Sequence, residues 1–224
     1  MKHYILFFLK ALFPTRMFSR RSYSQFGEDL LIDSILQYPK GYRGFYVDVG
    51  AHHPFALSNT AYFYKKGWQG INIEASPSLM TKFKIFRRRD INLNYAVGSS
   101  AQPLDFHVFK NYQPFNCFDK DMAKERINSG LHLKEVIKIR QVRLDVLLDK
   151  YLNGSSIDFM TIDVEGLDLD VLKTNNWEKY RPKVLVTEDY DTTDDSSISN
   201  FIESKGYSKV AFLKGHVGIY KRKD

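Results

Sequence analysis

Acidic side chains lie at or near the ends of four short apolar runs of this sequence. Their placement is the first indication of a functional site. YVDVG (46–50) carries Asp48, INIEAS (71–76) carries Glu74, FMTIDVEG (159–166) carries Asp163 and Glu165, and VLVTED (184–189) carries Glu188. One such acid alone is typical of a helix cap. In a doubly wound sheet, however, ligands bind outside the carboxyl ends of the strands. Gathered carboxylates repel each other unless a ligand, cation or donor compensates them, so the pattern predicts a ligand site.

The spacing of these residues narrows the class of ligand. Glu74 lies 24 residues after Gly50 (74 − 50), close to the offset of roughly 20 residues at which an acid takes ribose hydroxyls in dinucleotide folds. The turn Gly-Ala-His-His-Pro lacks the later glycines of G-x-G-x-x-G, which let a pyrophosphate approach. S-adenosylmethionine therefore fits better than NAD. Asp48 would face the amino acid end of this cofactor, directly or through water, and Gly50 would let it come close.

The elements that must position these residues alternate between strand and helix patterns, which predicts a sheet built by crossover connections. Strands are expected at 44–50, 70–76, 91–99, 156–166 and 183–190, and helices at 24–38, 57–67, 76–86, 143–152 and 167–173. Residues 206–222 alternate across a turn at Lys214, which is typical of an antiparallel hairpin. The expected fold class is α/β, a mostly parallel, doubly wound sheet with a C-terminal antiparallel hairpin. An insertion at about 103–143 breaks the rhythm with two strand-like runs and a loop.

The composition fits one globular domain over residues 21–224. With 43% hydrophobic and 15% aromatic residues in 224, the chain has ample core and is not disordered. The single cysteine, Cys117, excludes an intrachain disulfide and a cysteine-based zinc cluster, which favours a reducing, cytoplasmic compartment. The net charge of +7 favours acidic partners such as phosphate-bearing substrates, anionic lipid or nucleic acid.

Residues 1–20 form a separate apolar and basic segment. Its apolar stretch, 4–13, is interrupted by Lys10 and is too short to span a bilayer. No small-residue cleavage site of a secretory signal follows it. Two interpretations remain, a short helix packed on the domain or an interfacial helix on an anionic membrane, which would place the protein at the inner face of that membrane. Pro14 is expected to end the segment.

Four blocks of the sequence resemble the FkbM family of S-adenosylmethionine-dependent methyltransferases. They are SQFGED (24–29), YVDVGAHHP (46–54), SNTAYFYKKGWQGINIEASP (58–77) and IDFMTIDVEGLDLDVL (157–172), and they cover most of residues 22–190. The resemblance implies a Rossmann-like methyltransferase fold with a final antiparallel strand and S-adenosyl-L-methionine as cofactor. It also implies O-methylation, often of hydroxyls on glycans or natural products. Most of the insertion lies outside these blocks, so the acceptor is the least defined part.

Candidate catalytic residues follow from the resemblance and the strand ends. Asp163 and Glu165 follow the fourth strand, where methyltransferases commonly place groups that face the transferring methyl. O-methylation needs the acceptor hydroxyl deprotonated or polarised, which a carboxylate or a histidine can do. Alternatively, both acids cap the helix that begins near Leu167. His52 and His53 are adjacent, so their side chains point apart in an extended loop and only one would face the acceptor.

The predicted cofactor contacts follow the same strand ends. They are Glu28, Asp48, Gly50, Ala51, Glu74, Ala75, Ala96, Val97 and Asp163. Ala96 and Val97 end the third strand, where the adenine would lie. Glu28 belongs to a segment that either folds over the site or simply caps the first helix.

Three further features have weaker interpretations. The run 87–89, three arginines, is expected to be a solvated helix end, or else to hold an acidic glycan or a lipid phosphate. Residues 111–119 are expected to form a lid or acceptor-binding loop, or an ordered surface loop. Asp168 and Asp170 are expected to be surface charges that favour the N-terminus of a helix.

Other function classes use the same sheet. An NAD-linked oxidoreductase would need the missing glycines, and a noncatalytic S-adenosylmethionine-binding module would keep only the cofactor contacts. Nucleic acid is not the expected partner, because the basic residues are not interleaved with aromatic ones; a small molecule or a glycan is expected instead. Asp163 and Glu188 are oxygen ligands that would suit Mg²⁺, but their spacing does not require a metal and none is predicted. The sequence leaves the oligomeric state open.

Overall fold

The computed structural model describes residues 19–99, 102–110, 115–191, 193, 195–214 and 216–223. Nearly all of the N-terminal segment 1–20 lies outside this range, so packing and membrane contact both stay predictions for it. Within the described ranges, no helix is long and apolar enough to cross a membrane.

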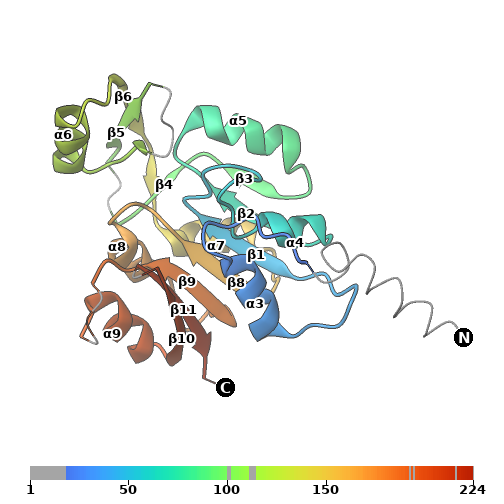
Figure 1. Ribbon diagram of the computed structural model, residues 1–224. Coiled ribbons are helices and arrows are strands. Elements are labelled where there is room, and N and C mark those ends of the chain that lie inside the picture. The colour runs from blue at the N-terminus through green and yellow to red at the C-terminus, as the bar shows by residue number, and fades with distance from the viewer. Residues whose placement is uncertain are drawn as a thin grey trace, which may run out of the picture.

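A seven-stranded sheet forms the centre of the molecule, in the order β10-β11-β9-β8-β1-β2-β3 (Figure 1). Its strands are β1 (Phe45–Val49), β2 (Gln69–Ile73), β3 (Ile91–Leu93), β8 (Phe159–Ile162), β9 (Val184–Glu188), β10 (Tyr207–Leu213) and β11 (Val217–Arg222). The strands from β9 to β3 are parallel, whereas β11 pairs antiparallel with β9 and β10. The predicted α/β fold with a C-terminal hairpin is confirmed. The carboxyl ends of β1, β2 and β8 meet at one edge of the sheet.

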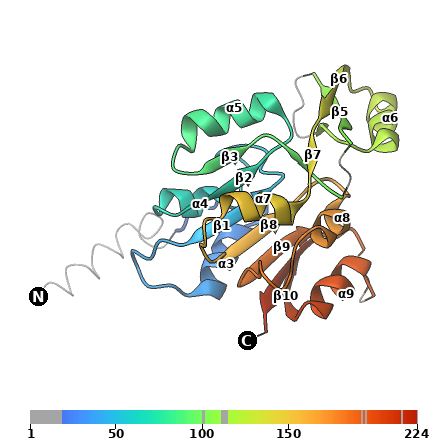
Figure 2. The ribbon, with the colours of Figure 1, turned by 180° about the vertical axis from the view of Figure 1, so that it is seen from behind.

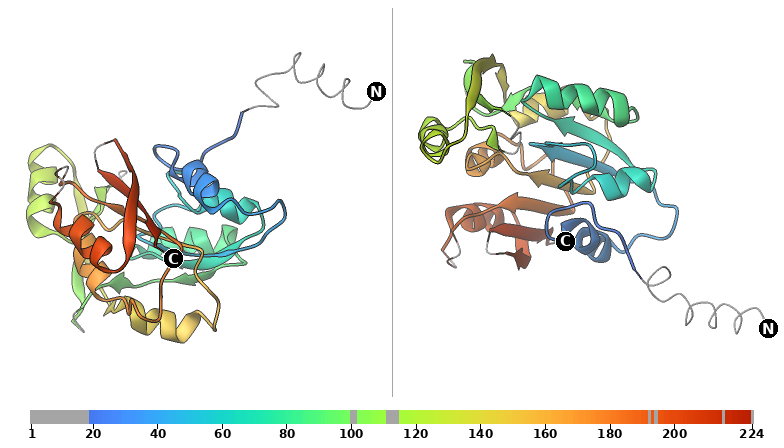
Figure 3. Two further views of the ribbon diagram at one scale, coloured as in Figure 1. Left: turned by 90° about the horizontal axis from the view of Figure 1, so that it is seen from below. Right: turned by 45° about the horizontal axis from the view of Figure 1, so that its top comes forward.

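Helices cover both faces of the sheet (Figures 2 and 3). The helices are α3 (Glu28–Leu36), α4 (Ala61–Lys65), α5 (Pro77–Phe86), α6 (Lys120–Asn128), α7 (Leu144–Tyr151), α8 (Asp168–Lys173) and α9 (Ser197–Ser204). Residues of α7, α8 and α9 pack with Val47 and Val49 of β1 on one face. Ile32 of α3 and Phe63 of α4 pack with Tyr46 on the other. Because successive side chains of a strand point to opposite faces, β1 is buried on both.

The predicted third strand, 91–99, is split in the structure. After β3 the chain leaves the main sheet, and β4 (Ala96–Val97) pairs with β7 (Gln141–Val142). The insertion between them forms an antiparallel pair, β5 (Leu104–Phe109) with β6 (Leu133–Ile139), and carries α6. Asn94 stands at the break, and its side-chain amide donates to the carbonyls of Glu74 and Ala75 at 2.8 Å each. This amide fixes the break to the end of β2.

Arg87 follows α5 and is wholly buried, so the prediction of a solvated helix end is wrong for this residue. Its guanidinium donates to Asp90 at 2.9 Å, to the Pro54 carbonyl at 2.8 Å and to the Tyr46 hydroxyl at 2.7 Å. Burial of an unpaired charge is costly, and these partners compensate it. The other two arginines of the run are exposed, as predicted.

Candidate functional site

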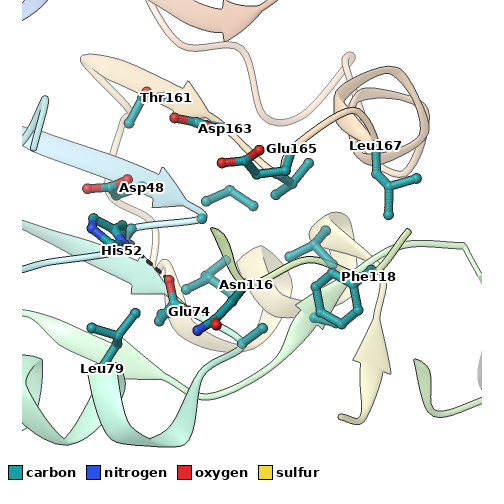
Figure 4. Close-up of a pocket in the computed structure, with 18 of the residues that line it drawn as sticks. Asp48, His52, Glu74, Leu79, Asn116, Phe118, Thr161, Asp163, Glu165 and Leu167 are labelled. Atoms are coloured by element: carbon teal, nitrogen blue, oxygen red, sulfur yellow. Dashed lines mark hydrogen bonds between the residues drawn. The ribbon is translucent and has the colours of Figure 1, made fainter. Parts of the chain in front are cut away.

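A cavity of about 160 Å³ opens at the carboxyl ends of β1, β2 and β8 (Figure 4). An ordered water needs roughly 10–15 Å³ on the same measure, so a ligand of many atoms fits. The predicted site residues that line the cavity are Asp48, Gly50, Ala51, His52, Glu74, Ala75, Ala96, Val97, Asp163 and Glu165. The predicted residues His53 and Glu28 do not line it. Phe106, Asn116 and Phe118 of the insertion close its other side.

Gly50 ends β1 with a positive φ of 80°, a conformation that suits glycine. Its amide donates to the Ile73 carbonyl at 2.9 Å, which ties the turn to β2. A Cβ atom here would lie 1.7 Å from the backbone carbonyl oxygen of Asp163. The backbone just after β8 therefore already requires a glycine at this position, and the expectation that Gly50 lets the cofactor come close stays a prediction.

Gly50→Ala is expected to destabilise the fold, and not only to weaken ligand binding. Left-handed strain and overlap with a backbone oxygen together should cost roughly 2–5 kcal/mol in the free energy of unfolding. Gly166→Ala is the matched control, since Gly166 has a φ of 93° but no atom lies within 4 Å of the position that a Cβ atom would take there. It should lose only the strain, about 1–2 kcal/mol. Urea denaturation of both variants measures the difference, and equal losses would contradict the overlap.

Asp48 points into the cavity from β1 and is nearly buried. The Thr60 hydroxyl donates to its Oδ2 atom at 2.6 Å. Thr60 in turn accepts a hydrogen bond from the buried Arg87 at 3.1 Å. The Thr60 hydroxyl thus connects the Arg87 guanidinium to the Asp48 carboxylate. Burial raises the pKa of Asp48 to about 6, and the Thr60 hydrogen bond opposes this rise. The carboxylate is thus held in one orientation, ionised at neutral pH.

Glu74 ends β2 with both carboxylate oxygens hydrogen-bonded to backbone amides. Oε2 accepts from the His52 amide at 2.8 Å, and Oε1 accepts from the Ser76 amide at 2.6 Å. Burial raises the pKa of Glu74 to about 7, although the two amides favour its charged form. These bonds fix the carboxylate at the cavity wall, and each oxygen keeps a lone pair for a ligand hydroxyl.

The two histidines differ in position. His52 lines the cavity, and burial, followed by the neighbouring His53, lowers its pKa, so its ring is neutral at neutral pH. The Nδ1 atom of His53 accepts from the amides of Phe55 and Ala56 at 3.2 and 3.1 Å, and this ring stabilises the loop. The geometry thus favours His52 over His53 as a group that meets a ligand.

Acidic side chains gather where β8 and β9 end. Asp163 and Glu188 hydrogen-bond to each other, and burial followed by the Glu188 charge raises the pKa of Asp163 well above its ordinary value. Asp163 is exposed and lines both cavities. Burial also raises the pKa of Glu188, the partner that accepts the hydrogen bond. Two carboxyl groups in hydrogen-bond contact favour a state in which they share one proton.

Asp168 contributes to the same cluster from inside the fold. It is buried, so its prediction as a surface charge is wrong, whereas Asp170 is exposed as expected. Its carboxylate accepts from the Thr187 hydroxyl and from the Gly166 amide, both at 3.3 Å. Burial, followed by the Glu188 charge, raises the pKa of Asp168 to about 7. Asp168 therefore links the start of α8 to β9.

Glu165 lines the cavity but is already paired. It has a positive φ of 57°, and its carboxylate accepts from Arg126 of α6 at 3.0 Å. Arg126 also donates to the Phe115 carbonyl at 2.7 Å. The ion pair ties the insertion to the loop after β8, so Glu165 holds the wall of the cavity in place.

Asn116 is a cavity residue that the sequence marked only as part of the loop 111–119. Its Oδ1 atom accepts from the Phe109 amide at 2.9 Å. Its buried Nδ2 atom has no partner in the described part of the chain. A buried donor without an acceptor is costly, which indicates that a ligand atom accepts from it. No local pattern distinguishes this asparagine, because only the folded insertion brings it to the cavity.

A second, smaller cavity adjoins the first. The two share Gln25, Leu57, Asn59, Thr161 and Asp163 among their lining residues, and the smaller one adds Glu28 and Glu188. The Glu28 carboxylate accepts from the Phe26 amide at 2.8 Å. The structure thus gives Glu28 a place in the second cavity and a role in the turn before α3. Among the described residues, no group of three or more acidic, histidine or cysteine side chains has the arrangement of a metal site.

The parallel sheet with its antiparallel last pair, and the cavity over β1, β2 and β8, define a Rossmann-like methyltransferase fold. The profile described as the methyltransferase FkbM domain matches residues 48–209, and the chain belongs to this family. S-adenosylmethionine is the cofactor of the family. The donors and walls of the cavity fit it, above all the unpartnered Asn116 amide and the exposed edge of the Glu74 carboxylate.

Several solved structures are similar to this chain. Methyltransferase FkbM from Methylobacillus flagellatus is 15% identical, with a TM-score of 0.50 over 88% of this chain and 48% of that protein, so the chain spans about half its length. A TehB-like S-adenosylmethionine-dependent methyltransferase from Corynebacterium glutamicum is 12% identical, with a TM-score of 0.43 over 100% of both chains. A putative O-methyltransferase from Klebsiella pneumoniae is 11% identical, with a TM-score of 0.42 over 88% of this chain and 80% of that one. No curated protein matches the sequence.

Proposed function

We propose that the chain transfers the methyl group of S-adenosylmethionine to a hydroxyl group of a sugar or glycan. One observation carries the proposal. The large cavity adjoins a smaller polar one that reaches Glu188, whose carboxylate accepts from the hydroxyl of the exposed Tyr190 at 2.9 Å. A cofactor site thus leads to an acid pair and then to an exposed aromatic ring.

The cofactor would be held by the residues of the large cavity. Glu74 would accept from the ribose hydroxyls, and Asp48 would face the amino acid end. Ala96, Val97 and Phe106 supply apolar walls for the adenine, and the Asn116 amide would donate to a ligand acceptor atom. When bound, the cofactor supplies an electrophilic methyl group on a positively charged sulfur.

The acid pair would take the proton of the acceptor hydroxyl. As the oxygen–carbon bond forms and the carbon–sulfur bond breaks, the hydroxyl proton must leave. The Asp163–Glu188 pair carries one proton and one negative charge, so it has room for one more proton. A positioned base of this kind typically contributes roughly 10²- to 10⁴-fold to the rate.

The smaller cavity has the chemistry of a sugar site. Gln25 and Asn59 supply amides that both donate and accept, and Glu188 accepts. Tyr190 is 60% exposed at its edge. Its ring stacks on His216, with centroids 5.8 Å apart, which holds it in place. Polar groups beside an exposed aromatic ring suit a sugar, because the hydroxyls bind the polar groups and the C–H face packs on the ring.

Tyr190→Ala is expected to raise the KM for a sugar acceptor by roughly 2- to 10-fold, the value of an aromatic contact. Tyr190→Phe keeps the ring and should keep the KM near that of the wild type, whereas loss of the hydrogen bond to Glu188 should act on turnover. The measurement is transfer of labelled methyl to separate pools of glycans, hydroxylated metabolites and RNA, with the cofactor Kd by calorimetry. Transfer to RNA alone would overturn the proposal. Cofactor binding without transfer to any pool would indicate a noncatalytic binding module.

A further inference from the structure

A basic and apolar surface lies at the C-terminal end of α5 and beside α4. We define it as the α5 face: Phe55, Lys65, Lys84, Ile85, Phe86 and Arg88. Ile85 and Phe86 are 51% and 55% exposed, which is unusual for two neighbouring large apolar side chains. Figure 1 and the right view of Figure 3 show α4 and α5 on the same side of the molecule.

Contacts link three members of the α5 face, Phe86, Phe55 and Lys65. The rings of Phe55 and Phe86 are in edge contact, with centroids 6.2 Å apart. The Lys65 ammonium lies 5.3 Å from the centroid of Phe55 and 5.4 Å from that of Tyr23.

The charge of this region has one sign. Between residues 49 and 89 the only acidic residue is Glu74, and it is buried at the cavity. The same stretch contains Lys65, Lys66, Lys82, Lys84, Arg87, Arg88 and Arg89, of which only Arg87 is buried. Arg87 pairs with Asp90 inside the fold, and Lys66 contacts Asp33 of α3 at 2.6 Å. The residues that define the α5 face combine exposed apolar side chains with positive charges and include no acid.

We infer that the α5 face docks on an anionic lipid membrane. Lysine and arginine heads bind lipid phosphates while Ile85, Phe86 and Phe55 enter the boundary between headgroups and acyl chains. A nucleic acid would use the same charges but would leave the isoleucine exposed, so the apolar centre favours lipid. Leu57 lies two residues after Phe55, is 52% exposed and lines both cavities. Docking by this face therefore brings the loop at the cavity wall close to the bilayer.

The experiment is partition of the full-length chain onto vesicles of phosphatidylcholine with phosphatidylglycerol, measured by co-sedimentation. Ile85→Ser with Phe86→Ser should weaken binding at least about tenfold, since each loses most of an apolar side chain from the interface. Lys84→Gln with Arg88→Gln should weaken it by roughly 25-fold at low salt, about fivefold for each charge. Binding of the wild type should fall as salt rises.

Matched variants on the far side of the sheet serve as controls. Val146→Ser removes an equally exposed apolar side chain from α7, and Lys150→Gln with Lys173→Gln removes two exposed charges. Both should bind as the wild type does, and all variants should keep their melting temperatures and cofactor Kd. Absence of vesicle binding, equal binding to pure phosphatidylcholine, or equal losses in the controls would overturn the inference. None of these outcomes depends on which acceptor is methylated.

Discussion

Asp163→Asn is expected to lower turnover by roughly 10²- to 10⁴-fold and to leave the cofactor Kd close to that of the wild type. The change keeps the shape of the side chain and its hydrogen bond to Glu188 but removes a site for the proton. An asparagine amide cannot share a proton with Glu188, so the Glu188 carboxylate alone would have to take the proton of the acceptor hydroxyl. Stopped assays of methyl transfer and calorimetry with the cofactor measure the two quantities separately.

The pKa values of the pair also predict the direction in which turnover changes with pH. Burial raises the pKa values of both Asp163 and Glu188, and the charge of the pair appears only as its first proton leaves. Turnover should therefore increase with pH, over a range above that of an ordinary carboxyl group, about pH 4. Glu188→Gln removes the group that ionises first and should abolish this increase.

Asp170→Asn is the matched control, because Asp170 is an exposed acid on α8 outside both cavities. It should keep full turnover and the wild-type pH profile. Full turnover in Asp163→Asn would contradict the proton-acceptor role and leave that carboxyl as a structural partner of Glu188. The candidates for a base would then be Glu188, which lines the smaller cavity, and Glu165 and His52, which line the large one.

The strands could be predicted from their local apolar runs. The position of the cavity could be predicted because ligands bind at the carboxyl ends of parallel strands. All of β1 and β8 is buried, as their unbroken apolar runs indicate. Parallel strands bring their carboxyl ends to one edge, so Asp48, Glu74 and Asp163 could be placed together without any long-range contact.

Helix α9 was not among the predicted helices, although the sequence contains a pattern that indicates it. Its apolar residues Ile198, Phe201 and Ile202 follow helical spacing, and Ser196 accepts from the Ser199 amide as an N-cap.

The buried polar groups could not be predicted, because partners distant in sequence decide their burial. Arg87 resembles a solvated helix end until the fold brings Tyr46, 41 residues away, to its guanidinium. Asp168 resembles a surface charge at a helix N-terminus until the fold brings Thr187 of β9, whose hydroxyl donates a hydrogen bond to it. Helix α6 is too polar to show an apolar face, with Ala123 as its only buried residue among those described. The role of Asn116 at the cavity depends on that insertion, so no sequence pattern pointed to it.

Glu74→Gln is expected to weaken cofactor binding by roughly 10- to 150-fold, because a charge-assisted hydrogen bond to the ribose is worth about 1.5–3 kcal/mol. Isothermal calorimetry measures the Kd. Two backbone amides also depend on this carboxylate, so the variant should lose some stability as well, which the melting temperature records.

Two comparisons separate the ribose contact from the support of the turn. An analogue of the cofactor with a dideoxyribose cannot donate to Glu74, so its affinity should be nearly the same for the wild type and for Glu74→Gln. Asn94→Ala removes another side chain that holds the end of β2 but does not line the large cavity. It should lower the melting temperature and keep the wild-type ratio of affinities between the two ligands.

The pH dependence of binding provides the last test of Glu74. Its pKa is raised to about 7 by burial, so the carboxylate loses its charge as the pH falls through that value. Cofactor affinity should therefore be highest above pH 7 and decline below it, and the difference between the wild type and Glu74→Gln should shrink in the same range. Burial also raises the pKa of Asp48, to about 6 in the wild type, so the loss of its charge lowers affinity in the same direction in both proteins. A difference that stays constant with pH would mean that the Glu74 charge does not contact the ribose, and that the residue only fixes the turn between β1 and β2.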